Sequence, residues 1–143
     1  MKVVPVTTAI IDDVVAVFIK AYNQPPWNYG WTADRAKQYL LEYMNCGNFT
    51  GFVLYDDNDV AGAVFGHTKT WWTGRQLMID ELFISSEKQR KGYGKMLLDY
   101  CDRYAADNQL SSIVLMTNKY MPSFGFYDKN GYTTAGQYVF MFR

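Results

Sequence analysis

The segment Gln89-Arg90-Lys91-Gly92-Tyr93-Gly94 constrains the fold most, because it joins an apolar run to an amphipathic helix. The run before it, residues 78–84 (MIDELFI), reads as a strand. After it, apolar residues recur at helical spacing on one face from Tyr93 to Tyr104. The two glycines let the backbone approach a ligand closely, and the start of a helix presents unpaired N–H groups. We therefore expect an α/β unit with an anion site at the start of its helix.

The charges around this turn favour a phosphate ligand. Arg90, Lys91 and Lys95 add positive charge to the positive end of the helix dipole. The Walker pattern GxxxxGK[ST] is absent, and the Rossmann pattern fails because Leu97 stands where its third glycine is needed. The turn alone predicts a pyrophosphate site of unspecified class.

Two helices are predicted ahead of the sheet. The first begins at Thr7 or Thr8 and ends in Asn23-Gln24-Pro25-Pro26, because no helix crosses two prolines comfortably. The second begins near Thr32 and ends at Gly47. The segment between them, residues 25–31, is an aromatic loop.

Strand patterns and turn residues predict the sheet. The expected β segments are residues 49–55, 60–68, 76–84, 112–117 and 132–143. A short helix is expected from Pro122 to just before Gly131. With no linker and no internal repeat, the order α-α-β-β-β-α-β-α-β-β predicts a single α/β (α+β) domain over residues 1–143, with one mixed sheet flanked by helices.

Composition excludes several functional classes. The formal net charge is zero, which gives no electrostatic case for nucleic-acid or membrane-surface binding, and disfavours an aromatic-rich RNA-binding sheet. No apolar run approaches the ~20 residues that span a bilayer, and the N-terminus lacks a signal-peptide pattern. Cys46 and Cys101 form no framework of spacings, so free thiols in a cytoplasmic protein are expected. His67, the only histidine, has no metal-ligand spacing with either cysteine, so we expect a structural role for it and no metal.

A second motif lies downstream of the turn. Residues 122–132 (PSFGFYDKNGY) resemble motif B of the GNAT superfamily of acyl-CoA-dependent N-acetyltransferases, and strand, Q-x-x-G-x-G and helix resemble its motif A. The resemblance covers about Gln76 to Tyr132, and the two leading helices extend it over nearly the whole chain. It implies a GNAT-like fold, a twisted mixed sheet with helices on both faces. It also implies transfer of an acetyl group from acetyl-CoA to a primary amine, by direct attack in a ternary complex. Ser123 and Tyr120 depart from the alanine and asparagine usual in motif B.

The resemblance implies a set of residues that hold coenzyme A. Backbone amides of the turn would bind the pyrophosphate, and unpaired backbone of the preceding strand would run beside the pantetheine arm. Asn118 or Thr117 would replace the usual asparagine. The implied cofactor-binding residues are Phe83, Ile84, Gln89, Arg90, Lys91, Gly92, Tyr93, Gly94, Lys95, Asn118 and Tyr127.

Three residues are candidates for proton transfer. An alkyl amine has a pKa near ~10, so a carboxylate must accept its proton. Strand alternation sends Asp80 and Glu81 to opposite faces unless a bulge intervenes, and we favour Glu81, with Asp80 as its rival. The resemblance makes Tyr127 the group that protonates the departing thiolate. The competing interpretations are a solvated carboxylate for either acid and a core aromatic for Tyr127.

Aromatic residues indicate where the acceptor binds. The resemblance places the acceptor pocket at the first inter-helix loop and neighbouring strands, where rings can bind a cationic amine, although loop anchoring explains them equally well. The candidate substrate-binding residues are Trp27, Tyr29, Trp31, Trp71 and Trp72. Nearby acidic residues favour a small cationic amine, such as an aminoglycoside or polyamine, over a protein amine. The family also suggests a homodimer through the apolar last strands. A non-catalytic coenzyme A-binding or sensory domain is the alternative function.

Overall fold

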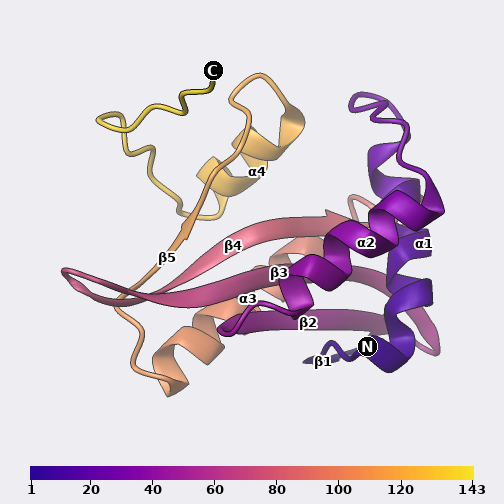
Figure 1. The fold of residues 1–143 in the computed structure, drawn as a ribbon, viewed down its shortest axis with the longest axis horizontal. Helices are drawn as coiled ribbons and strands as arrows, with labels where there is room; N and C mark the ends of the chain where they lie inside the picture. Colours follow the sequence, from indigo (N-terminus) through magenta and orange to yellow (C-terminus); the bar gives the residue numbers. More distant parts are fainter.

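Five strands form one sheet in the computed structural model, which describes residues 1–143 (Figure 1). The strands are β1 (Lys2–Pro5), β2 (Phe49–Asp56), β3 (Asp59–Trp71), β4 (Gly74–Ile84) and β5 (Ser112–Leu115). They lie in the order β1-β2-β3-β4-β5, and every neighbouring pair is antiparallel except β4 and β5, which are parallel. The helix α3 (Tyr93–Asp107) makes the crossover that this parallel pair requires.

Helices cover both faces of the sheet (Figure 1). Two of them, α1 (Ile11–Tyr22) and α2 (Ala33–Met44), pack on one face, and α3 packs on the other. The short helix α4 (Pro122–Lys129) follows β5, and one-turn 3-10 helices occupy Thr8–Ile10 and Ser86–Lys88. None of these helices is long and apolar enough to cross a bilayer. The predicted fold class, a mixed sheet flanked by helices, is confirmed.

The core has two parts because side chains alternate across the sheet. On β3, Ala63 and Phe65 point to the α1 and α2 side, whereas Val64 between them points to α3. On α1, Phe18 is 1% exposed and its ring meets the Phe83 ring of β4 edge-on at 5.1 Å. Burial of these apolar faces, rather than helix propensity, holds the layers together.

A β-bulge interrupts the pairing of β3 with β4. Phe65 lies opposite Glu81 and the next residue, Gly66, lies opposite Ile79, so Asp80 is an extra residue on β4. Glycine is required on the facing strand, because a Cβ on Gly66 would meet the Met78 carbonyl. The bulge decides which way the acidic residues of β4 point.

The parallel strands β4 and β5 pair along only part of β4. They pair only from Gln76 with Ser112 to Ile79 with Leu115, while β4 continues to Ile84. Beyond Ile79, β4 therefore has no neighbour on its β5 side. This opening positions the candidate site.

The two ends of the chain differ from the prediction. The strand β1 was not predicted, because four residues give too short a pattern to identify. The predicted β structure over 132–143 is wrong, since residues 133–143 form no strand. Alternation of apolar side chains makes a strand only where a neighbour pairs with it, and the one backbone bond here joins Tyr138 N–H to the Ala135 carbonyl. The apolar tail is exposed instead, with Phe142 90% accessible.

Candidate functional site

A cavity of about 840 Å³ opens where β4 and β5 separate. Its walls come from the end of α1, the loop after α1, β4, the turn before α3, the end of β5 and α4. Segments distant in sequence therefore converge on one space. Most residues singled out from the sequence line it.

The turn before α3 supplies an anion cradle. The backbone N–H groups of residues 89–95 donate no hydrogen bond within the protein. Gly92, the residue before the helix, has φ of 82°, a left-handed conformation that glycine adopts without strain. The start of α3 adds the positive end of its dipole. Unpaired donors in this arrangement fit a pyrophosphate group, such as that of coenzyme A.

The cations around the cradle differ in whether they form an ion pair with an acidic side chain. Lys88 pairs with Asp56 at 2.9 Å, and Lys95 pairs with Asp99 at 2.8 Å. Arg90 also lines the cavity and has no acidic partner within 4.0 Å. Lys91 likewise has no acidic partner but does not line the cavity. Of the cradle cations that line the cavity, Lys88, Arg90 and Lys95, only Arg90 has a charge that no carboxylate compensates.

A glycine brings the cradle close to α4. A Cβ added at Gly94 would lie 2.9 Å from Cζ of Phe126. Hydrogen therefore suits this position best, since it lets α4 pack against the start of α3. The next residue on α4, Tyr127, is buried yet lines the cavity.

The hydroxyl of Tyr127 donates to no group of the protein, although most other buried hydroxyls have partners. Burial raises the pKa of this phenol well above its ordinary value, and the neighbouring Tyr132 and Glu81 raise it further. Tyr127 therefore stays protonated and presents a free O–H to the cavity.

The bulge places both acidic residues of β4 on the α1 and α2 face. Glu81 accepts a 2.7 Å hydrogen bond from the Tyr22 hydroxyl on Oε2 and another of 2.7 Å from Tyr39 on Oε1. Burial raises the pKa of Glu81, the two phenol bonds oppose this rise, and the charge of Asp80 adds to it. A half-buried carboxylate with a raised pKa is a stronger base than an exposed one.

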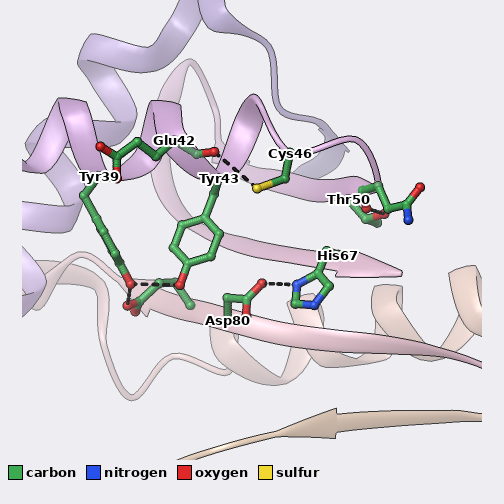
Figure 2. Close-up of polar contacts among 9 residues, drawn as sticks. Tyr39, Glu42, Tyr43, Cys46, Thr50, His67 and Asp80 are labelled. Carbon is green, nitrogen blue, oxygen red and sulfur yellow. Dashed lines mark hydrogen bonds and ion pairs between the residues drawn. The ribbon is translucent and has the colours of Figure 1, made fainter. Parts of the chain in front are cut away.

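Asp80 has a different partner. Its Oδ2 lies 2.6 Å from Nδ1 of His67 on β3, as Figure 2 shows. In the same view the hydroxyls of Tyr39 and Tyr43 lie 3.3 Å apart, and since the Tyr39 proton goes to Glu81, Tyr43 is the donor of this pair. Both Asp80 and Glu81 line the cavity. Strand alternation would have placed the two carboxylates on opposite faces. The β-bulge, which the sequence analysis allowed as an exception, places them on the same face.

The remaining coenzyme A candidates lie along the opening. Phe83 and Ile84 line the cavity beyond the end of β5, and the Ile84 carbonyl accepts a hydrogen bond from the Gln89 side chain at 3.2 Å. Thr117 and Asn118 line the opposite wall. The Asn118 side chain accepts a bond from the Tyr120 backbone N–H at 2.9 Å, which fixes the loop after β5.

The aromatic candidates separate into three groups. Trp27 and Tyr29 line the cavity, and the Tyr29 ring stacks on Tyr22 at 5.9 Å. Trp31 does not line it; its ring stacks on Tyr39 at 5.1 Å and anchors the loop to α2. Trp71 and Trp72 lie at the exposed β3–β4 hairpin, outside the cavity lining.

Sequence reasoning missed Tyr22, Tyr39 and Tyr43. All three stand at apolar positions of predicted helices, where packing in the core is a sufficient reason for an aromatic ring. The one available signal was the choice of tyrosine. A helix face that makes only apolar contacts can use phenylalanine, so three tyrosines indicate that the hydroxyls have partners. Their hydroxyls matter only once the fold brings Glu81 to them.

The cradle, the half-buried carboxylates and the free phenol line one cavity. The sequence profile described as "Acetyltransferase (GNAT) family" matches residues 16–132. The chain belongs to the GNAT acetyltransferase family. The resemblance of its motifs is confirmed, and membership of this family supports an acetyltransferase. No curated protein sequence matches it significantly.

Solved structures share the GNAT fold at low identity. A transcriptional regulator from Bacillus halodurans C-125 superposes with a TM-score of 0.81 at 14% identity, covering 99% of both chains. The aminoglycoside antibiotic 6'-N-acetyltransferase AAC(6')-IG from Acinetobacter haemolyticus gives 0.80 at 11% identity, over 100% of this chain and 98% of that one. A GNAT family acetyltransferase from Staphylococcus aureus gives 0.75 at 19% identity, over 100% and 99%. These likenesses show the fold of this GNAT domain.

Proposed function

We propose that this GNAT protein transfers an acetyl group from acetyl-CoA to a primary amine of a small cationic acceptor, by direct attack in a ternary complex. One observation carries the proposal: a single cavity holds unpaired backbone donors, a half-buried carboxylate and a free phenol. Acetyl-CoA, when bound, supplies an acetyl group activated as a thioester. The family and the two motifs support the choice of donor.

On the donor side, the backbone N–H groups of residues 89–95 bind the pyrophosphate, and Arg90 adds an uncompensated charge. The backbone of Phe83 and Ile84 runs beside the pantetheine arm. Tyr127 gives its phenolic proton to the departing sulfur. Its raised pKa keeps that proton in place at neutral pH.

On the acceptor side, Glu81 takes the proton that the attacking amine loses, and Asp80 is the alternative base. Trp27 and Tyr29 offer ring faces to a cation, and the two carboxylates add negative charge. The structural neighbours include proteins named aminoglycoside acetyltransferases, which supports a cationic small molecule. We further propose that residues 1–143 form one domain that acts in the cytoplasm, supported by its free cysteines.

A panel of amines tests the function. Polyamines, aminoglycosides, amino acids and a peptide amine are incubated with acetyl-CoA, and release of free thiol is recorded. We expect release with cationic small amines, and micromolar acetyl-CoA binding in calorimetry. Binding without turnover on any amine would instead support a coenzyme A-binding or sensory domain, and absence of binding would refute the proposal.

The unequal pairing of cations at the cradle gives a first prediction. Arg90→Gln is expected to weaken acetyl-CoA binding about threefold to fivefold, because it removes an exposed charge that no carboxylate compensates. The loss should shrink at high salt. Lys95→Gln is the matched control and should have less effect, since Asp99 already neutralises Lys95. Titration calorimetry at two salt concentrations makes the comparison, and an equal or larger effect of Lys95→Gln would contradict it.

The exposed tail gives a second prediction. We propose that the protein forms a homodimer through residues 133–143, whose apolar side chains include Phe140 at 73% exposure and Phe142 at 90%. Sedimentation equilibrium should give a dimer for the natural chain and a monomer for the double variant Phe140→Ser, Phe142→Ser. The control double variant Thr133→Ser, Thr134→Ser keeps the apolar residues, so it should remain a dimer. A monomeric natural chain would refute this proposal.

A further inference from the structure

The carboxylate of Glu81 is held by phenols from two different helices. The Tyr22 hydroxyl on α1 reaches Oε2 and the Tyr39 hydroxyl on α2 reaches Oε1, each at 2.7 Å. Each oxygen thus has one donor and keeps lone pairs for a further partner. Glu81 also faces the cavity, so a ligand there meets a carboxylate whose orientation is already fixed.

Packing alone does not explain these hydroxyls. The Tyr22 ring packs on Phe18 at 4.8 Å, and the Tyr39 ring packs on Trp31 at 5.1 Å. Phenylalanine would make the same ring contacts at both positions. What phenylalanine lacks is the O–H that meets Glu81. The hydroxyls therefore have their role in bonding to the carboxylate. Without them Glu81 would be a half-buried acid with no hydrogen-bond donor, which favours its neutral form.

The surroundings of Glu81 leave the phenols as its only hydrogen-bond donors. Around it stand Tyr22 on α1, Tyr39 and Tyr43 on α2, Asp80 on β4 with its partner His67 on β3, and Tyr127 on α4. No lysine or arginine forms an ion pair with it. The neighbouring Asp80 disfavours a second negative charge. Only the two phenol bonds favour the ionised carboxylate.

We propose that Tyr22 and Tyr39 are positioning residues for acetyl transfer, whose hydroxyls keep Glu81 ionised and aimed at the amine. The inference rests on the proposed function, in which Glu81 is the base. A base must be ionised before it can accept a proton. The phenols therefore set the lowest pH at which the enzyme works.

The pH profile of kcat/KM tests this proposal. A hydrogen bond donated to the carboxylate stabilises its charged form and lowers its pKa, so removing it raises the pKa. Tyr22→Phe, Tyr39→Phe and the double variant should therefore move the acid limb of the profile to higher pH, by about one unit for the double variant. The loss relative to the natural enzyme should be about tenfold on the acid limb and within about twofold near pH 9. The pH dependence of the amine is the same for both enzymes, so it cancels in the ratio of the variant's kcat/KM to that of the natural enzyme.

Tyr43→Phe is the matched control. Its hydroxyl bonds to Tyr39 rather than to Glu81, so the acid limb should move much less. In a Glu81→Gln background, the two phenylalanine substitutions should cause no further pH-dependent loss. A loss that is uniform across the pH range would show a merely structural role and overturn the proposal, as would an unchanged profile.

A second measurement reads the carboxylate without turnover. Infrared difference spectra between the natural chain and Glu81→Gln report the ionisation of Glu81 directly. The titration midpoint should rise in the double phenylalanine variant. If no amine is acetylated but this midpoint rises, the proposed function fails while the role of the phenols stands. If acetylation occurs but the midpoint stays, the phenol proposal alone fails.

Discussion

Tyr127→Phe should lower kcat about 10²-fold or more, within the ~10²–10⁴ range of general acid catalysis. The phenol is the free O–H donor from α4 in the cavity and has no partner in the protein. Acetyl-CoA affinity should change less than about twofold, because the ring remains and the cradle is untouched. Steady-state kinetics and calorimetry give the two quantities. An unchanged kcat would remove Tyr127 from the mechanism.

Tyr132→Phe is the matched control for this variant. The Tyr132 ring meets that of Tyr127 at 5.6 Å, but its hydroxyl is buried without a partner. Removing an unsatisfied hydroxyl should leave kcat unchanged and stability equal or higher. The alkaline limb supplies a further check. Since burial raises the pKa of Tyr127, its loss of the proton should fall above the ordinary tyrosine value near ~10.

Glu81→Gln is expected to lower kcat/KM about 10²–10³-fold at neutral pH, because no carboxylate then takes the amine proton at that position. The deficit should shrink as pH approaches the amine pKa near ~10, where the amine is already neutral. The amide can still bond to the Tyr22 and Tyr39 hydroxyls, so the melting temperature should change little. Kinetics across pH, with thermal unfolding alongside, measure both effects.

Asp80→Asn is the comparison that separates the two acids. If Glu81 is the base, this variant should lose far less activity than Glu81→Gln at every pH. The reverse order would make Asp80 the base and contradict our assignment. His67 should then matter as well, since it is the partner of Asp80 at 2.6 Å.

Local patterns were sufficient to predict most of this fold. The strand, glycine turn and helix around Gly92 are contiguous, so their sequence alone specifies them. The same holds for the short helix that carries Tyr127. Because each motif is a continuous segment, the two motifs together contain most of the coenzyme A candidates that line the cavity.

The remaining features depend on contacts between distant residues. Whether Asp80 and Glu81 share a face depends on a bulge that Gly66 accommodates on another strand. The role of Tyr39 depends on a carboxylate 42 positions away. Single-sequence patterns carry neither relation.

Apolar patterns also mislead where pairing is absent. The alternation of apolar residues in the tail predicts a strand, yet no neighbouring strand pairs with it. Trp71 and Trp72 read as pocket aromatics, but the length of the hairpin carries them away from the cavity. In both cases the side chains are informative about chemistry and uninformative about position.

The bulge at Asp80 has one more consequence. The pairs on either side of it, Phe65 with Glu81 and Gly66 with Ile79, are those that a strand lacking Asp80 would form. Asp80 is thus an inserted residue that leaves the flanking register intact. A single-codon insertion or deletion would therefore add or remove this second acidic group without changing the turn before α3.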